Sequence, residues 1–337
     1  MLAAFATTAR QLRAAYDAAR SAPIPFAGAV RSVAVCGMGG SAAAGDVVTA
    51  AFSDRLGVPM STLRGYRVPR GFGEDDLVLC VSYSGNTEET VAAYAAARER
   101  GCPTVAVCGG GELADRAAEA GTPVVEISTD APVPRAGLGG LTGGLMGALV
   151  ACGVLSNVDE DVEDAVETAG DLGGALGPDA PTGRNEAKDI ALWLGDRIPV
   201  IWGSEGVTAA AAWRWKTAFN ENAEVPAFAS VLPELDHHEV VGWTGGRGAG
   251  FRLLILREEG EHPRVQARLD ATLEEISGAA LERLQVGARG GTPLARAMGL
   301  ALVGDLASTY HALGRGIDPA AMRSLTRIKQ RLAEAGR

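Results

Sequence analysis

The sequence predicts an α/β protein with two domains, each built on a mainly parallel sheet that is flanked by helices. Three observations support this prediction. Short apolar, β-rich runs alternate with alanine-rich stretches of helical periodicity, which is typical of βαβ units. The length of 337 residues favours two domains. A strand, a Gly/Ser turn and an alanine-rich helix occur in the first half and again in the second, which indicates a duplication.

The first predicted domain, residues 1–155, contains four strands with helices between them. Its N-terminal segment is predicted to be an amphipathic surface helix, because it lacks the basic start, apolar centre and cleavage site of a signal peptide. The apolar runs that we expect to be strands are 31–37, 76–82, 102–108 and 122–128. The expected helices are 41–53, 86–100, 111–120 and a glycine-rich, tightly packed one at 138–155.

An acidic segment with glycine and proline, residues 156–190, is predicted to connect the two domains. The second domain, residues 191–337, repeats the opening pattern of the first. The expected strands are 198–206, 251–258 and 282–288, and the first of them leads through a Gly/Ser turn into an alanine-rich helix. The long helices that we expect after it are 264–280, 293–314 and 320–335. Duplicated sheets commonly bind ligands between them, at strand C-terminal ends.

The composition restricts the class of function. The formal net charge of -10 disfavours nucleic acid as a partner, and no apolar run is long enough for a membrane span. The five cysteines include no C-x-x-C pair, so we expect buried free thiols and a cytoplasmic location. His237 and His238 are adjacent on a segment predicted to be extended, where neighbours point to opposite sides. No metal and no redox cofactor is therefore expected.

Two turns of the first domain have the composition of an anion site. In "CGMGGSAAAGD", residues 36–46, the glycines permit close backbone approach and Ser41 begins a helix, whose free N–H groups favour an anion. In "VSYSGNTEET", residues 81–90, three hydroxyls crowd together at the end of a strand, those of Ser82, Ser84 and Thr87. Helix capping explains one of the three hydroxyls but not all of them. The stretch has no lysine or arginine, which favours a phosphomonoester held without magnesium.

Three further segments contain candidate catalytic residues. Glu221 in "NEN" ends a helix, where a carboxylate opposes the dipole and suits a proton-abstracting base; a polar helix terminus is the alternative. One histidine of "LPELDHHEVVGW", residues 232–243, is interpreted as an acid or base in a cleft. Arg135 follows two prolines, which aim its guanidinium at an anion or sugar oxygen. Lys329 is one of only three lysines, and a solvated helix face is its alternative.

These segments together resemble a known family. "GMGGSAAAGD", "SYSGNTEET", "PRAGLGG", "NENAEVPAF" and "LPELDHHEVVGW" occur in the order found in the bifunctional phosphoglucose/phosphomannose isomerases of the sugar isomerase (SIS) superfamily. The resemblance covers nearly the whole chain. It implies two SIS domains, each a mainly parallel sheet flanked by helices in a flavodoxin-like three-layer sandwich. It also implies a homodimer with the site near the subunit interface.

The resemblance further implies a role for each candidate residue. The residues that would bind the phosphate of the sugar are Gly40, Ser41, Ser82, Ser84 and Thr87. Glu221 would move a proton through a cis-enediolate, which Arg135 would stabilise. His237, reaching in from the partner subunit, would assist ring opening together with Lys329. The reaction would interconvert glucose 6-phosphate and/or mannose 6-phosphate with fructose 6-phosphate, without metal or cofactor.

The chain departs from the family pattern at four positions. They are Ala42, Ala43, His238 and, by ungapped counting from Lys329, Met322. These departures bear on the relative activity towards the two sugars more than on the reaction. Two other functions remain open: another SIS enzyme that acts on an amino-sugar phosphate, and a non-catalytic phosphosugar-sensing protein. The presence of both the Glu221 and the His237 segments disfavours the sensor.

Overall fold

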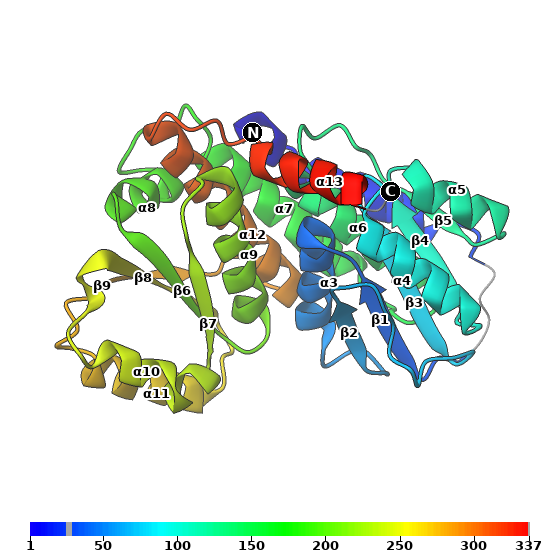
Figure 1. The fold of residues 1–337 in the computed structure, drawn as a ribbon. Helices are drawn as coiled ribbons and strands as arrows, with labels where there is room; N and C mark the ends of the chain where they lie inside the picture. The colour runs from blue at the N-terminus through cyan, green and yellow to red at the C-terminus, as the bar shows by residue number, and fades with distance from the viewer. Residues whose placement is uncertain (25–28, 336–337) are drawn as a thin grey trace.

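Two parallel sheets lie side by side, with helices between and around them, in the computed structural model, which describes residues 1–24 and 29–335 (Figure 1). The first sheet has the strand order β2-β1-β3-β4-β5, and the second has the order β7-β6-β8-β9. Every neighbouring pair of strands is parallel. The predicted α/β class is therefore confirmed, and the first sheet has the order typical of flavodoxin-like proteins.

The central strands of the first sheet are buried on both faces, which explains their continuous apolar runs. The sequence pattern does not predict β2, a short and half-exposed edge strand of sequence MSTL. The strands of this sheet are β1 (Ser32–Cys36), β2 (Met60–Leu63), β3 (Asp76–Ser82), β4 (Thr104–Cys108) and β5 (Val124–Glu126). The helices of this half are α1 (Leu2–Phe5), α2 (Thr8–Arg20), α3 (Gly39–Phe52), α4 (Glu88–Glu99), α5 (Gly111–Glu119), the 3-10 turn η1 (Pro134–Gly137) and α6 (Leu138–Ala151).

Helix α6 packs tightly against α2. Gly139, Gly143 and Gly147 recur once per turn, and a Cβ atom on any of them would overlap atoms of α2. The N-terminal segment is amphipathic as predicted, but it is more than a surface helix, because Leu12 and Tyr16 of α2 are buried in the core. The glycines of α6 therefore serve close helix packing, as the sequence predicts for 138–155.

The second half repeats the architecture with four strands. They are β6 (Ile198–Ser204), β7 (Phe228–Leu232), β8 (Phe251–Arg257) and β9 (Glu282–Gly287). The helices are α7 (Asp159–Ala175), α8 (Glu186–Leu194), α9 (Val207–Asn222), η2 (Glu234–His237), α10 (Glu239–Trp243), η3 (Gly248–Gly250), α11 (Pro263–Glu275), α12 (Pro293–Gly314) and α13 (Arg323–Ala335). The predicted strands and long helices are all present close to their expected bounds, and the edge strand β7 is again the one that the pattern does not predict.

The acidic segment predicted as a connection contains two helices. α7 exposes most of its carboxylates, although Asp161 is buried, and it packs its apolar side on α2 and α12, so residues from this segment belong to the core. The domain bounds 1–155, 156–190 and 191–337 stay a prediction. Although α12 is 22 residues long and buried on most sides, no helix in the described ranges has the length and apolar character to cross a membrane.

Each sheet forms the middle of three layers. One face of the first sheet packs on α4 and α5, and its other face packs on α3 and α6. One face of the second sheet packs on α11, and its other face packs on α9 and α12. The inner helices of both halves share one apolar core. The five cysteines are buried free thiols, as predicted.

Candidate functional site

The two predicted anion-binding turns lie next to each other at the carboxyl edge of the first sheet. β1 pairs in parallel with β3, so the turns that follow these strands are neighbours. The strand order reverses at this pair, because β2 lies beyond β1 whereas β4 lies beyond β3. Such a switch point is where doubly wound sheets bind ligands. The Tyr83 backbone N–H donates to Ser41 Oγ at 3.2 Å and joins the two turns.

Hydrogen bonds within the serine-rich turn hold its hydroxyls in place. Ser82 Oγ donates to Thr87 Oγ1 at 3.0 Å and accepts from the Gly85 N–H at 3.1 Å. Ser84 Oγ is exposed and accepts from the Asn86 N–H at 3.2 Å. Thr87 precedes α4, but its side chain makes no capping hydrogen bond there. Capping therefore does not explain this turn, and the start of α4 remains available to an anion.

Gly85 is required by the backbone of the same turn. Its φ is +69°, in the left-handed region that side chains disfavour. A Cβ atom at this position would also overlap the carbonyl oxygen of Gly110. The close approach of the two loops, after β3 and after β4, depends on this glycine.

Arg135 lies at the junction of the two halves. Arg135 belongs to η1, which packs on the start of α3. A Cβ atom added to Gly40 of α3 would lie 3.6 Å from the Cα of Arg135. The side chain is only 2% exposed. Nε donates to Asn222 Oδ1 at 2.6 Å, and Nη2 donates to the Pro319 carbonyl at 2.6 Å. Nη1 lies 3.3 Å from Glu221 Oε2. Burial lowers the pKa of Arg135, and the charge of Glu221 opposes that shift.

Glu221 lies in the last turn of α9, as predicted, with its side chain 30% exposed. α9 brings it to the Arg135 guanidinium from the second half of the chain. The structure therefore places the predicted base beside the predicted cation. Gly40, which belongs to the first anion-binding turn, lies close to Arg135. The carboxyl edge of the first sheet thus meets the end of α9, where β7 is about to begin.

Two charged residues that the sequence pattern does not single out complete this cluster. Arg214 Nη2 donates to the Arg135 carbonyl at 2.6 Å and lies 2.7 Å from Asp305 Oδ1. That oxygen nevertheless accepts no hydrogen bond of normal geometry. Burial raises the pKa of Asp305 to about 6, although both arginines act to lower it. Asp305 is the only acidic residue of the apolar helix α12, and this isolated charge is the feature of the sequence that could have identified it.

A cleft of about 690 Å³ lies between α3 and α9. Gly39 and Arg214 line it near the charge cluster, and Arg64, Trp213 and Lys216 line it further out. The cleft therefore borders the charge cluster at Arg214.

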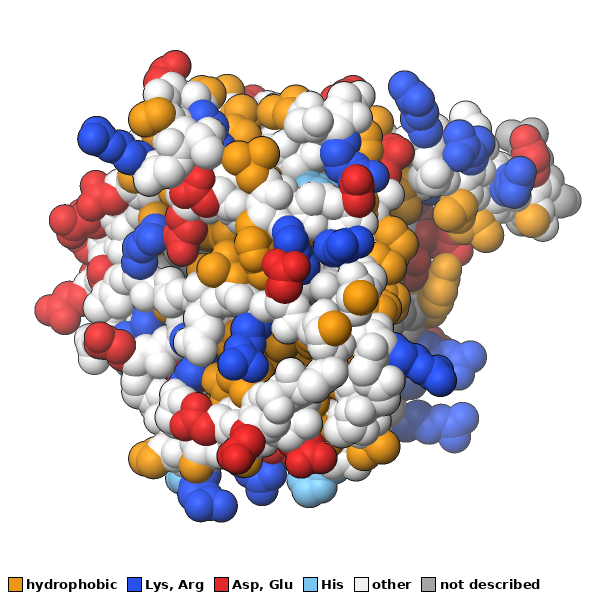
Figure 2. All heavy atoms as spheres, turned by 90° about the vertical axis from the view of Figure 1, so that its left-hand side faces the viewer, with side chains coloured by type: hydrophobic (Ala, Val, Ile, Leu, Met, Phe, Trp, Pro, Cys, Tyr) orange, Lys and Arg blue, Asp and Glu red, His pale blue; other side chains and the backbone are white. Residues whose placement is uncertain are grey.

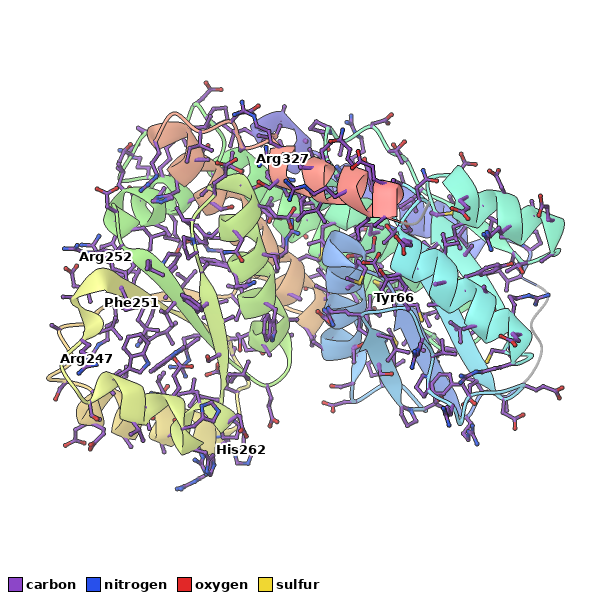
Figure 3. The ribbon with its side chains drawn as sticks, viewed as in Figure 1. Tyr66, Arg247, Phe251, Arg252, His262 and Arg327 are labelled. Carbon is purple, nitrogen blue, oxygen red and sulfur yellow. The ribbon has the colours of Figure 1, made fainter. Side chains whose placement is uncertain are left out.

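His237 lies apart from Glu221 within one chain. The prediction of an extended segment at His237 and His238 is wrong, because η2 forms a 3-10 turn there and both side chains are exposed. η2 follows the C-terminal end of β7, whereas Glu221 precedes its N-terminal end. The five residues of β7 span about 17 Å. His262, which follows β8 at the same edge of the second sheet, lies at the bottom in Figure 3, opposite Arg327 of α13.

Lys329 is not among the residues that form the charge cluster. It lies on α13, none of whose residues is buried. Figure 2 shows this helix as an arm that stands out from the body at the upper right. Three large apolar side chains of the arm are about half exposed: Leu325, Ile328 and Leu332. The described chain alone brings neither His237 nor Lys329 to Glu221.

The second half has its own turn of this type, but a carboxylate occupies it. Ser204 ends β6 and Thr208 follows it, as Ser41 follows β1, and the hydroxyls of Ser204 and Thr208 bond to each other at 2.9 Å. Ser204 Oγ also donates to Glu261 Oε1 at 3.0 Å, and Glu261 pairs with Arg257. The negative side chain of Glu261 disfavours a second anion at this turn.

Within residues 1–24 and 29–335, no three side chains of His, Cys, Asp or Glu lie together as metal ligands would.

Comparisons with known proteins identify the family and the fold of the chain. Residues 29–133 match the model of the SIS domain, and residues 183–332 match that of the bacterial phospho-glucose isomerase C-terminal SIS domain. The chain is 32% identical to the bifunctional phosphoglucose/phosphomannose isomerase of Caldicellulosiruptor bescii over 96% of both chains. It is also 32% identical to the Aquifex aeolicus protein of that name, over 90% of both chains. A glucose-6-phosphate isomerase like protein of Thermus thermophilus shares the fold, with a TM-score of 0.61 at 20% identity over 96% of both chains.

Proposed function

The chain belongs to the family of bifunctional phosphoglucose/phosphomannose isomerases, and we propose that it interconverts glucose 6-phosphate and/or mannose 6-phosphate with fructose 6-phosphate. One observation carries this proposal. Glu221 and Arg135, a carboxylate and a cation 3.3 Å apart, lie beside a neutral anion-binding turn at the sheet switch point. An aldose–ketose isomerase needs a base, a group that offsets the charge of the intermediate, and a phosphate anchor.

The phosphate anchor acts through binding energy. Gly40 and Ser41 present the start of α3, and the hydroxyls of the second turn complete the cradle, which consists of Ser82, Ser84 and Thr87. All of these donors are neutral, so they hold a phosphomonoester by hydrogen bonds, and we propose that the reaction needs no metal. The anchor lies away from the reacting carbons and positions them against Glu221.

Glu221 transfers the proton. Its carboxylate takes the proton from C2 of the open-chain aldose, and the C–H electrons form the C1=C2 bond of a cis-enediolate while O1 gains negative charge. Arg135 offsets this charge. The proton of the C2 hydroxyl passes to O1, so the negative charge moves to O2. Glu221 then returns its proton to C1: the C1=C2 electrons form the new C–H bond, and O2 forms the carbonyl at C2, which gives the ketose. C2 is planar in the enediolate, so glucose and mannose 6-phosphates share one intermediate, and rotation about C2–C3 presents either face to the base.

We propose that the active form is a homodimer in which His237 reaches the site of the partner subunit and, with Lys329, moves the proton that opens the sugar ring. The position of His237 beyond the far end of β7 supports this arrangement, since it does not reach Glu221 of its own chain. The exposed apolar stripe of α13 supports a second copy as well. The buried free thiols favour a reducing, cytoplasmic location.

Two variants test the base and the dimer together. Glu221→Gln keeps the shape of the side chain but removes the base, so turnover is lost while phosphosugar binding persists. His237→Ala is expected to be inactive too. When the two inactive variants are mixed and exchange subunits, the mixed dimer regains one site with both wild-type residues only if His237 acts across the interface. Near-wild-type turnover by Glu221→Gln contradicts the base assignment, and no recovery on mixing contradicts the shared site.

A further inference from the structure

The two asparagines that flank Glu221 have different partners. Asn220 Nδ2 donates to the Val225 carbonyl at 2.9 Å and fastens the turn after α9. Asn222 is 0% exposed and bonds to Arg135 instead. The "NEN" segment thus has one asparagine that serves the local fold and one that faces the charge cluster.

The orientation of the Asn222 amide is fixed by its partners. Arginine has only donors, so the oxygen of the amide must face Arg135 Nε, at 2.6 Å. Its Nδ2 donates to Ser308 Oγ at 2.9 Å, and Ser308 Oγ donates to the Asp305 carbonyl at 3.0 Å. The chain of donors and acceptors therefore links Arg135, through the amide, to the backbone of α12.

Neutral acceptors hold Arg135 more closely than the carboxylate does. Asn222 Oδ1 and the Pro319 carbonyl lie 2.6 Å from Nε and Nη2, whereas Glu221 Oε2 is 3.3 Å from Nη1. The other charged groups at the guanidinium are Arg214 and Asp305. A guanidinium free to turn would present two N–H groups to Glu221 in the bidentate pair that arginine and carboxylate prefer.

We propose that Asn222 is a positioning residue, which holds Arg135 by Nε so that one edge of the guanidinium faces the reacting oxygen while Glu221 stays free of a bidentate pair. This inference rests on the proposed function, because it assigns a purpose to Arg135 and Glu221. Without the Asn222 acceptor, Arg135 turns towards Glu221, and both the base and the charge-stabilising group leave their working positions.

The test compares three single variants with the wild type in steady-state kinetics and thermal unfolding. Asn222→Ala removes the acceptor, and we expect kcat to fall about 10- to 100-fold with KM within about threefold. Asn222→Asp has the same shape and keeps an acceptor at Nε, so its kcat should lie between those of the wild type and Asn222→Ala. Asn220→Ala is the matched control. It loses a hydrogen bond of the same kind and lowers Tm, but leaves kcat within about twofold.

Each outcome decides the proposal. An unchanged kcat in Asn222→Ala, or an activity that follows Tm across all variants including Asn220→Ala, overturns it. If Asn222→Ala does not fold, Ser308→Ala takes its place. That variant removes the acceptor that orients the amide, and we expect kcat about three- to tenfold lower at unchanged KM; an unchanged kcat overturns the proposal. A wild-type protein inactive on both sugars overturns the proposed function and this inference with it.

Discussion

Asp305→Asn separates the effect of burial from the effect of the ion pair at the charge cluster. Asp305 is fully buried beside Arg214, and its Oδ1 accepts no hydrogen bond of normal geometry. Burial raises the pKa of Asp305 from 3.8 to about 6 in the folded protein. The asparagine has the shape of the protonated acid and does not titrate, so position 305 stays uncharged at every pH, as Asp305 is at low pH.

The magnitude follows from the shift in pKa. The folded protein holds the Asp305 proton more tightly than the unfolded chain, so the stability from this group is complete below the unfolded pKa and is lost as pH rises through the folded one. A shift of about two units at about 1.4 kcal/mol per unit removes about 3 kcal/mol in total, and about 2 kcal/mol of this falls between pH 4 and pH 7. About 1 kcal/mol of that loss falls between pH 5 and pH 7.

Urea unfolding of both proteins at pH 5, 6 and 7 measures the effect. Other titrating groups are common to both, so they cancel in the difference. We expect the wild type to lose about 1 kcal/mol relative to Asp305→Asn over this range. A wild type that instead gains stability relative to the variant as pH rises would refute the reasoning, because Arg214 would then outweigh burial and hold the pKa of Asp305 below its ordinary value.

Two further predictions concern the anion site and the projecting helix. Gly85→Ala places a side chain at φ +69° against the Gly110 carbonyl, so we expect a loss of about 2 kcal/mol or more and a KM for the sugar phosphate about tenfold higher. Gly73→Ala, where a Cβ meets nothing within 4 Å, is its control in urea unfolding and kinetics, and equal effects in the two variants would contradict the prediction. The double variant Leu325→Ser and Ile328→Ser should elute as a monomer with lost turnover in light-scattering chromatography and assay; an active dimer would show that α13 does not hold the second copy.

The parts of the fold that the sequence predicts are those set by local pattern. Strands buried on both faces, such as 76–82 and 198–204, carry continuous apolar runs that no other element explains. The edge strands β2 and β7 are short and half exposed, so their residues lack that signal. The prediction of an extended segment at His237 was wrong for a different reason. Its 3-10 geometry depends on Leu235, which is buried against the second sheet, a contact invisible in the sequence.

The candidate site divides along the same line. The hydroxyl-rich turn and Glu221 can be predicted from the sequence, because the turn has an unusual composition at a strand end and Glu221 is a carboxylate at a helix end. Asn222 and Asp305 do not, because their importance comes from the packing of α9 on α12, which joins Asn222 to a serine 86 positions further along the chain. Residue type predicts the groups that meet a substrate, whereas the groups that hold them require the tertiary structure.

The central claim is that this chain is a metal-independent isomerase of sugar 6-phosphates that uses Glu221 as its base. The most direct measurement is a coupled assay between glucose 6-phosphate and fructose 6-phosphate, and separately between mannose 6-phosphate and fructose 6-phosphate, with EDTA present and with Glu221→Gln in parallel. We predict turnover of at least one aldose by the wild type in EDTA, and none by the variant. No turnover of either sugar despite measurable binding, or equal turnover by the variant, would contradict the account.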